Sequence, residues 1–181
     1  MSPFEIPPAW DRYICHDYGY NGPFATLWLA RPPGTRIAYV YREQYGTGVT
    51  ADEQIALAAE ACDEASEKIR AVVLDPSLYN KVNVKGERID SIADDWKPYF
   101  NTIIRGDNNR VTGWQLVRKL LDWTEGPTGD TIQAPQLHVF TNCSNLIRTL
   151  PNLSVDTHNL EDVDSDGEDH AADALRYGLM H

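Results

Sequence analysis

Ala71-Val72-Val73-Leu74-Asp75-Pro76-Ser77 is the segment that most constrains the fold class of this 181-residue chain. Its first four residues are a short apolar run, which is typical of a strand buried on both faces of a parallel sheet. The run ends at Asp75, where the sequence Asp-Pro-Ser is typical of a turn. Because a predicted helix precedes the strand directly, the segment indicates an α/β domain.

The chain before this strand predicts that helix and three further strands. Thr50 and Glu53 form a capping-box pattern at the start of the helix, and apolar residues recur at helical spacing as far as Ile69. The connections between the three strands are short, which favours an antiparallel meander. We expect these strands at residues 13–15, 24–30 and 37–41.

The chain after the strand adds helices and one more strand. Residues 79–90 are polar and are expected to form a loop, whereas residues 136–140 are expected to form a strand. We predict helices at residues 92–100, 113–123, 142–150 and 168–180. The whole chain, residues 1–181, is expected to be one domain with an extended lead-in over residues 1–11. Its five predicted strands would form a mixed sheet flanked by helices, with the meander antiparallel and the other strands parallel. Four tryptophans are expected at or near the core: Trp28, Trp96, Trp114 and Trp123.

Composition and cysteine usage limit the class of protein. The apolar fraction of 42% and the charged fraction of 24% are ordinary for a globular chain. No apolar run is long enough for a membrane span, and the N-terminus lacks the pattern of a signal peptide. The three cysteines are expected to be reduced thiols rather than a zinc site or a disulfide framework: Cys15, Cys62 and Cys143.

The formal net charge of −11 argues at first against a nucleic-acid partner, which requires a basic surface. However, eight of the 27 acidic residues lie between Asp156 and Asp173, and the middle third of the chain is enriched in lysine and arginine. Carboxylates that bind cations would add to such a count. The charge therefore does not exclude a DNA substrate, and it predicts weak, metal-dependent and salt-sensitive binding.

The predicted closing helix carries the most distinctive polar pattern of the chain. It begins with acidic residues followed by good helix formers, which indicates a helix start. Asp169, His170 and Asp173 fall at positions i, i+1 and i+4, so Asp173 shares a face with both of the others. Three potential metal ligands within about one turn are unusual for a surface helix. The alternative is an acidic N-terminal turn with one solvated aspartate.

Asp17 and Asp75 each follow a predicted strand, the first and the fourth along the chain. In open α/β sheets, ligands bind at the carboxyl ends of strands near a switch in strand order. If the first and fourth strands are parallel neighbours, both carboxylates lie at one sheet edge, where the closing helix could add Asp173 and His170. These side chains suit Mg²⁺ or Mn²⁺, and clustered carboxylates repel one another unless a cation neutralises them. Alternatively, each aspartate belongs to an ordinary turn or strand exit.

Three basic residues follow Asp75 in the polar segment 79–90: Lys81, Lys85 and Arg88. They could contact DNA phosphates beside the metal, or they could belong to a solvated loop. His16, beside Asp17, could be a metal neighbour, but a histidine at a strand end is expected to pack or to form a hydrogen bond; His138 is expected to be structural. Thiol catalysis is not expected, because no cysteine has a histidine partner by motif.

Several segments together resemble the nuclease domain of tailed-phage terminase large subunits. The resemblance spans roughly residues 12–180, and its closing motif is quite specific. The segments that carry it are Asp17-Tyr18-Gly19-Tyr20, Asp75-Pro76-Ser77, Gly113-Trp114-Gln115-Leu116-Val117-Arg118, residues 140–146, and residues 168–177 with the pattern Asp-His-Ala-Ala-Asp. This family has a ribonuclease H-like fold, so the resemblance implies that fold here.

The resemblance also implies an activity. Enzymes of that family are metal-dependent endonucleases that cut concatemeric viral DNA during genome packaging, with an acidic cluster holding Mg²⁺ or Mn²⁺. By motif, Asp17 would be the acid of the first strand, Asp75 that of the fourth strand and Asp173 that of the final helix. Two ions bridged by a shared aspartate could activate water and stabilise the leaving oxygen. His170 would assist, and Asp169 is either a further ligand or the first-turn acid of the helix.

Partners follow from the same resemblance: double-stranded DNA, an ATPase motor domain, the terminase small subunit and the portal, in the cytoplasm of an infected or lysogenic host. The chain has no Gly-x-x-x-x-Gly-Lys-[Ser/Thr] phosphate loop, so it is expected to be a nuclease half without the motor, or a prophage remnant. The His170-x-x-Asp173 pair also resembles the closing helix of Holliday-junction resolvases. A junction resolvase and a non-catalytic docking module of the packaging complex therefore remain as alternatives.

Overall fold

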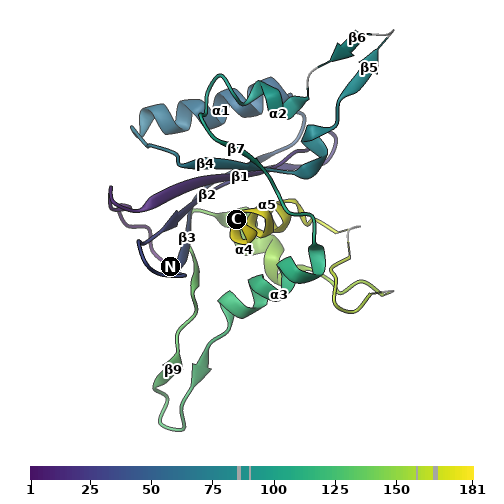
Figure 1. Cartoon of the computed structure of the whole chain (residues 1–181). Helices are drawn as coiled ribbons and strands as arrows, with labels where there is room; N and C mark the ends of the chain where they lie inside the picture. Colours follow the sequence, from purple (N-terminus) through teal and green to yellow (C-terminus); the bar gives the residue numbers. More distant parts are fainter. Residues whose placement is uncertain (85–86, 90, 158, 165–166) are drawn as a thin grey trace.

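A computed structural model describes residues 1–84, 87–89, 91–157, 159–164 and 167–181, with only the backbone of residues 82–84 and 87–89. Its centre is a six-stranded sheet in the order β10-β3-β2-β1-β4-β7 (Figure 1). These strands are β1 (Asp11–Asp17), β2 (Phe24–Arg31), β3 (Ala38–Gly46), β4 (Ala71–Leu74), β7 (Ile103–Arg105) and β10 (Leu137–Val139). Strands β1, β2 and β3 form the predicted antiparallel meander, and β4, β7 and β10 each add a parallel neighbour. The sheet is therefore mixed, as expected.

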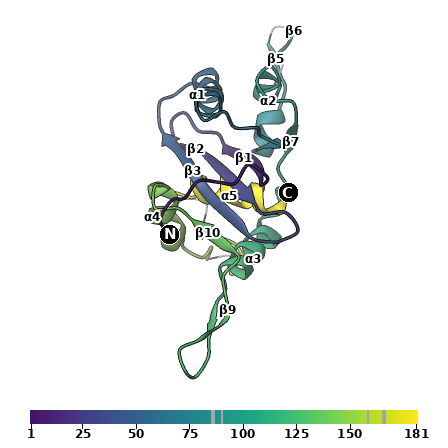
Figure 2. The ribbon, with the colours of Figure 1, turned by 90° about the vertical axis from the view of Figure 1, so that its left-hand side faces the viewer.

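Helices cover both faces of the sheet. Helices α1 (Ala51–Glu64) and α2 (Ile92–Asp95) lie on one face, whereas α3 (Arg110–Leu121), α4 (Ser144–Thr149) and α5 (His170–Met180) lie on the other (Figures 1 and 2). The capping box that starts α1 is present: the Thr50 hydroxyl accepts from the Glu53 amide, and the Glu53 carboxylate accepts from the Thr50 amide. No helix in the described ranges combines the length and the apolar character that a membrane crossing requires.

Helix α5 packs unusually close to the sheet. Every residue from Ala171 to Leu179 is buried, and the helix contacts both β1 and β2. Gly178 explains the close approach, because a Cβ atom there would lie only 2.1 Å from the Cys15 sulfur. The central strands contribute fully buried side chains to the core below it, among them Ile14 and Leu27. This packing holds the N-terminal end of α5 in a fixed place beside the sheet.

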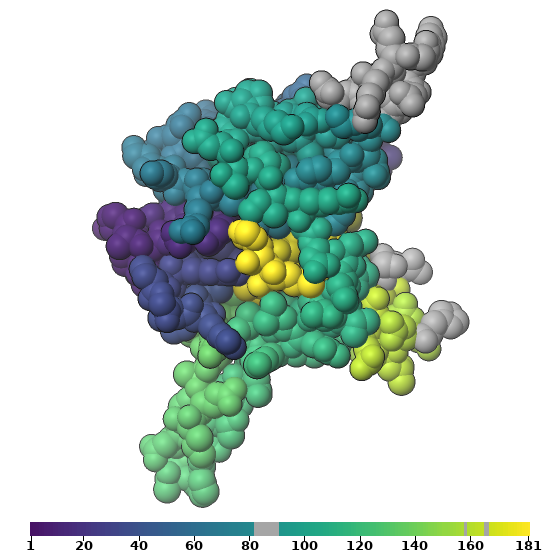
Figure 3. Space-filling view, in the orientation of Figure 1, coloured from purple at the N-terminus to yellow at the C-terminus, as the bar shows by residue number. Residues whose placement is uncertain are grey.

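Two hairpins lie outside the main sheet. Strands β5 (Val82–Val84) and β6 (Glu87–Ile89) form one, and β8 (Thr124–Glu125) and β9 (Thr131–Gln133) form the other. The β8–β9 hairpin projects away from the body of the molecule (Figure 3). Two short 3-10 helices, η1 (Pro76–Tyr79) and η2 (Leu150–Asn152), complete the structure.

Four local predictions were wrong. The sheet has six strands rather than five, because β7 has only three residues and shows no periodicity of its own. The predicted loop at 79–90 begins with the last residue of η1 and contains the β5–β6 hairpin. The helix predicted at 92–100 ends at Asp95. Trp123, expected at or near the core, is 56% exposed because it follows the end of α3 and enters the projecting hairpin.

Candidate active site

Asp17 and Asp75 leave the sheet side by side. Strands β1 and β4 are parallel neighbours with His16 opposite Leu74, and the Asp75 amide donates to the His16 carbonyl at 2.9 Å. The conditional prediction of a shared edge is confirmed, because the two aspartates follow paired positions of adjacent parallel strands. The carboxyl ends of β1 and β4 therefore bring two acids together that are far apart in the sequence.

Asp17 is buried and contacts the closing helix. Its Oδ2 lies 2.8 Å from His170 Nδ1, a contact across 153 residues of chain. Gly22 makes room for this ring, since a Cβ atom at Gly22 would lie 3.1 Å from His170 Nε2. Burial raises the pKa of Asp17 to about 7; the hydrogen bond from His170 opposes the shift, and the charges of Asp75 and Asp173 add to it. The hydrogen bond to Asp17 raises the pKa of His170. The Asp17–His170 pair therefore favours a bound proton between Asp17 Oδ2 and His170 Nδ1.

Asp75 has local partners. One carboxylate oxygen accepts from the Ser77 amide at 2.8 Å and the other from the Ser77 hydroxyl at 2.6 Å. These bonds cap η1, so the turn interpretation of Asp-Pro-Ser is correct as far as the backbone is concerned. The carboxylate nevertheless acts on its neighbours: its charge helps to raise the pKa of Asp17 and, after burial and the charge of Asp173, that of Tyr177. Asp75 therefore caps η1 and also lies near the other acids.

Asp173 is held by two arginines. Its Oδ1 accepts from Arg176 Nε at 3.0 Å, and its Oδ2 accepts from Arg110 Nη1 at 3.1 Å. Asp169, the N-cap residue of α5, lies 3.8 Å from Arg110 Nη2. Burial, followed by the charge of Asp173, raises the pKa of Asp169. On the helix side, the acids are thus neutralised within the protein.

The two arginines escaped the sequence analysis for different reasons. Arg176 lies three residues after Asp173 on the predicted closing helix, and this i, i+3 spacing was an available signal. Arg110 is 63 residues away from Asp173 in the sequence, and no local pattern relates them. Tyr177 was also missed as a member of the site, although it directly follows Arg176. Burial raises its pKa, and the charges of Asp173, Asp75 and Asp17 add to the shift.

The donor chemistry of these residues fits a hard divalent cation, whereas their present contacts are with other protein groups. Carboxylate oxygens and an imidazole nitrogen are ligands that Mg²⁺ or Mn²⁺ accepts. The raised pKa of Asp17 reflects a buried carboxylate among like charges, which a cation would relieve. Among the residues that the structure describes, no three His, Cys, Asp or Glu side chains form a group arranged to hold a metal. An ion at this place would therefore require these side chains to rearrange.

The remaining candidates lie outside this cluster or outside the described residues. Lys81 is exposed, with its Nζ 3.6 Å from Asp94. Lys85 lies outside the described residues, as does the side chain of Arg88, so their proposed phosphate contacts stay predictions. His16 is structural, as expected: its Nδ1 lies 2.9 Å from the Thr26 hydroxyl, and burial lowers its pKa to about 3.

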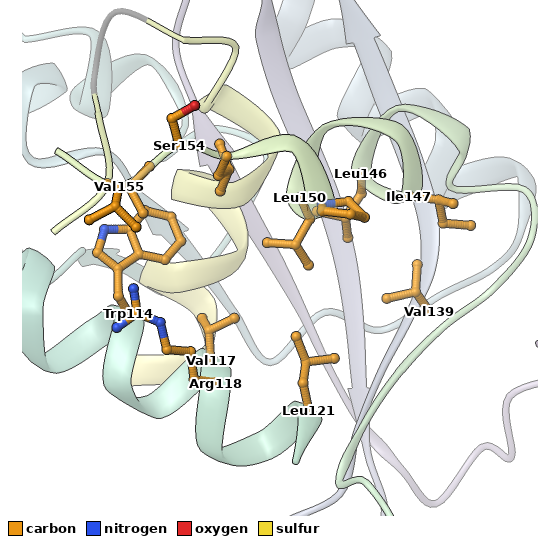
Figure 4. A pocket seen from close by; sticks show the side chains of 13 residues that line it. Trp114, Val117, Arg118, Leu121, Val139, Leu146, Ile147, Leu150, Ser154 and Val155 are labelled. Atoms are coloured by element: carbon orange, nitrogen blue, oxygen red, sulfur yellow. The ribbon is translucent and has the colours of Figure 1, made fainter. Parts of the chain in front are cut away.

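A mostly apolar cavity of about 440 Å³ lies between α3, α4 and residues 150–155 (Figure 4). Leu121, Leu146 and Leu150 line it, and none of the candidate acids does. Trp114 and Val163 also line the cavity, and both contact the Arg110 network from the other side. The cavity is therefore a neighbour of the acid cluster and not a part of it.

No protein-family model matches the chain, and no curated protein matches it at significant similarity. Solved structures do match. The nuclease domain of the P22 large terminase is 20% identical with a TM-score of 0.72, and the match covers 99% of this chain and 85% of that one. The nuclease domain of the large terminase from bacteriophage SPP1, with bound Mn, is 15% identical with a TM-score of 0.63, over 94% of this chain and 85% of that one.

A longer protein also matches. The large terminase of a thermophilic bacteriophage, solved in complex with ATP-γ-S, is 16% identical with a TM-score of 0.67. That match covers 96% of this chain and 41% of the thermophilic phage protein, so the present chain corresponds to less than half of that protein. The expected ribonuclease H-like fold is confirmed, because the chain shares its architecture with nuclease domains of phage large terminases.

Proposed function

We propose that this chain is a metal-dependent endodeoxyribonuclease domain that cleaves concatemeric viral DNA during phage genome packaging. One observation carries the proposal: Asp17 and Asp75, at the ends of adjacent parallel strands, lie beside the acidic N-terminal end of α5. The fold that produces this arrangement is that of phage large-terminase nuclease domains, one of which is solved with bound Mn. Membership of that family and the activity are inferred from these two facts together.

Asp17, Asp75 and Asp173 would hold the ions, two of Mg²⁺ or Mn²⁺, with Asp169 or His170 as a further ligand. When bound, the ions would supply Lewis-acid activation of a water molecule and stabilisation of the leaving oxygen. His170 orients the Asp17 carboxylate by sharing a proton between Nδ1 and Oδ2. Arg176 fixes the Asp173 carboxylate from the buried side through its Nε–H. The chain thus positions each acid with a neighbouring side chain.

Double-stranded DNA would be the substrate, and residues 1–181 would act as one domain. Lys81, Lys85 and Arg88 would contact phosphates from the segment that follows Asp75. The large terminase of the thermophilic phage carries more than twice the matched length and is solved with ATP-γ-S, which supports an ATPase motor as the partner. The terminase small subunit, the portal and the host cytoplasm complete the proposed setting.

The proposal is tested by nicking of supercoiled plasmid in the presence of Mn²⁺. We expect the wild-type chain to nick and Asp75→Ala to lose about 100-fold or more of the rate, since a ligand that stabilises developing charge is worth several kcal/mol. Glu60→Ala is the matched control, because Glu60 is an exposed acid on α1. Equal rates for Asp75→Ala and the wild type, or no nicking by either, would contradict the proposal. A strong preference for four-way junctions over linear duplex would instead indicate the resolvase alternative.

A further inference from the structure

Arg110 makes a set of contacts that ties two parts of the chain together. It is the first residue of α3, and its Nη1 donates to Asp173 Oδ2 at 3.1 Å. Its Nε donates to Asp162 at 3.0 Å, and its Nη2 donates to the Val163 carbonyl at 3.0 Å. The same Nη2 lies 3.8 Å from Asp169. One guanidinium therefore joins the acids of α5 to the segment that contains Asp162 and Val163.

Arg176 binds the same carboxylate but is much more firmly fixed. Its side chain is fully buried, its Nη1 donates to the Asp107 carbonyl at 3.2 Å, and its guanidinium lies 4.4 Å from the Tyr177 ring centre. A Cβ atom on Gly113 would lie 2.4 Å from Arg176 Cγ, so the aliphatic part of the side chain is enclosed as well. Arg176 cannot leave Asp173 without disrupting the core.

Arg110 is free to move by comparison. Its side chain is 24% exposed, and its guanidinium carbon lies 5.8 Å from the centre of the Trp114 ring. Its bonds to Asp162 and Val163 do not involve Asp173, so it can give up Asp173 and still keep other partners. The two arginines on one carboxylate thus differ in burial: Arg176 is part of the core, and Arg110 is partly exposed.

We propose that Arg110 is an internal competitor of the divalent cation: it occupies Asp173 Oδ2 and neighbours Asp169, and it releases both acids when the ion binds. The inference rests on the proposed metal-dependent function. Each carboxylate oxygen has two lone-pair positions, and Arg110 Nη1 occupies one of those on Asp173 Oδ2. A cation bound to the same oxygen would be repelled by the guanidinium, and the bond from Arg110 is the one that can be given up. Because Arg110 also binds Asp162 and Val163, its release couples ion binding to the position of residues 159–164.

Calorimetric titration of Mn²⁺ into the full chain tests the proposal without measuring cleavage. We expect Arg110→Gln to bind Mn²⁺ about tenfold more tightly than the wild type, because one charge-assisted hydrogen bond no longer competes. Arg118→Gln is the control: Arg118 is an exposed arginine on the same helix, so this variant has the same change in net charge and should shift the affinity much less. An unchanged or weaker affinity of Arg110→Gln would overturn the inference.

Three further measurements separate the possible outcomes. Arg110→Lys keeps the charge but cannot bridge Asp162 and Asp173, so it should bind Mn²⁺ about threefold more tightly than the wild type; this variant decides the matter if Arg110→Gln does not fold. In hydrogen exchange, Mn²⁺ should change the protection of residues 159–164 in the wild type and not in Arg110→Gln. Asp17→Asn should weaken binding in either background.

If the wild type binds Mn²⁺ and Arg110→Gln binds it equally, only this inference fails; if neither binds it, the proposed function fails as well.

Discussion

The acids on the strands and the acids on the helix differ in the charge of their protein partners. Asp17 and Asp75 have one histidine and one serine as partners, and Asp17 remains a buried carboxylate whose pKa is raised to about 7. Asp173 on α5 is bound by two arginines, one of which also approaches Asp169. The strand acids therefore contact no arginine in the contacts described, whereas Asp173 is bound by two. Acids that the fold brings close together can therefore still differ in how many cationic side chains balance their charge.

The largest expected effect concerns the fixed arginine of the helix side. Arg176→Met should lower the free energy of unfolding by about 3–5 kcal/mol, because it leaves the buried Asp173 carboxylate without one of its two cations. Arg110→Gln, which removes a partly exposed partner of the same carboxylate, should cost about 1 kcal/mol. Urea denaturation of both variants measures the difference. Equal losses would mean that the two arginines do not differ as their burial indicates.

A smaller effect concerns the pH dependence on the strand side. Because the folded pKa of Asp17 is raised to about 7 from an ordinary value of 3.8, the folded chain keeps a proton that the unfolded chain has lost between these values. Stability should therefore fall as the pH rises from 4 to 7, by roughly 2–4 kcal/mol in a chelating buffer. The raised pKa of His170 adds a further loss of stability at higher pH, beginning at the ordinary histidine value of 6.5 and continuing through its raised folded pKa.

Thermal unfolding at several pH values provides the measurement for this pH dependence. Asp17→Asn serves as the comparison, because the amide cannot ionise and the slope between pH 4 and 7 should become shallower. A slope that is identical in Asp17→Asn would show that other groups cause the pH dependence. A slope of opposite sign in the wild type would contradict the charge balance described for the strand acids.

The smallest predicted effect concerns the contact that joins the two sides. His170→Gln should weaken Mn²⁺ binding about tenfold, because it removes the ring that orients the Asp17 carboxylate. His138→Gln is the control, since His138 stacks on Tyr39 at the far strand β10. Calorimetry decides the question. If both variants bind Mn²⁺ as the wild type does, His170 is a packing residue and not a positioning residue.

Much of the fold follows from local patterns. The capping box of Thr50 and Glu53 marks the start of α1, and the apolar run 71–74 is the central strand β4. These predictions succeed because a cap and a short, wholly apolar run each depend on only a few neighbouring residues. Strand β7 and the β5–β6 hairpin were missed, because strands this short show little alternation of their own and form where a partner strand is supplied; β10 is equally short but was predicted.

The acids themselves were predicted from the sequence, whereas their partners were not. Asp17, Asp75 and Asp173 are recognisable because each occupies the end of a strand or the start of a helix. Asp17 lies beside Asp75 because β1 and β4 are parallel neighbours. The sequence predicted this proximity only on the assumption that these two strands pair. Arg110 gave no sequence signal at all, since a single arginine at the start of a helix is ordinary.

The types of the acids and the order of the elements were thus inherent in the sequence, since turns, caps and apolar periodicity involve neighbouring residues. The charge balance of the site was decided by the tertiary structure alone. Arg110 reaches Asp173 across 63 residues because α3 packs against α5 on the same face of the sheet. His170 reaches Asp17 across 153 residues because α5 packs on β1. Electrostatic interactions depend on distance in space and on burial, and neither quantity can be obtained from separation along the chain.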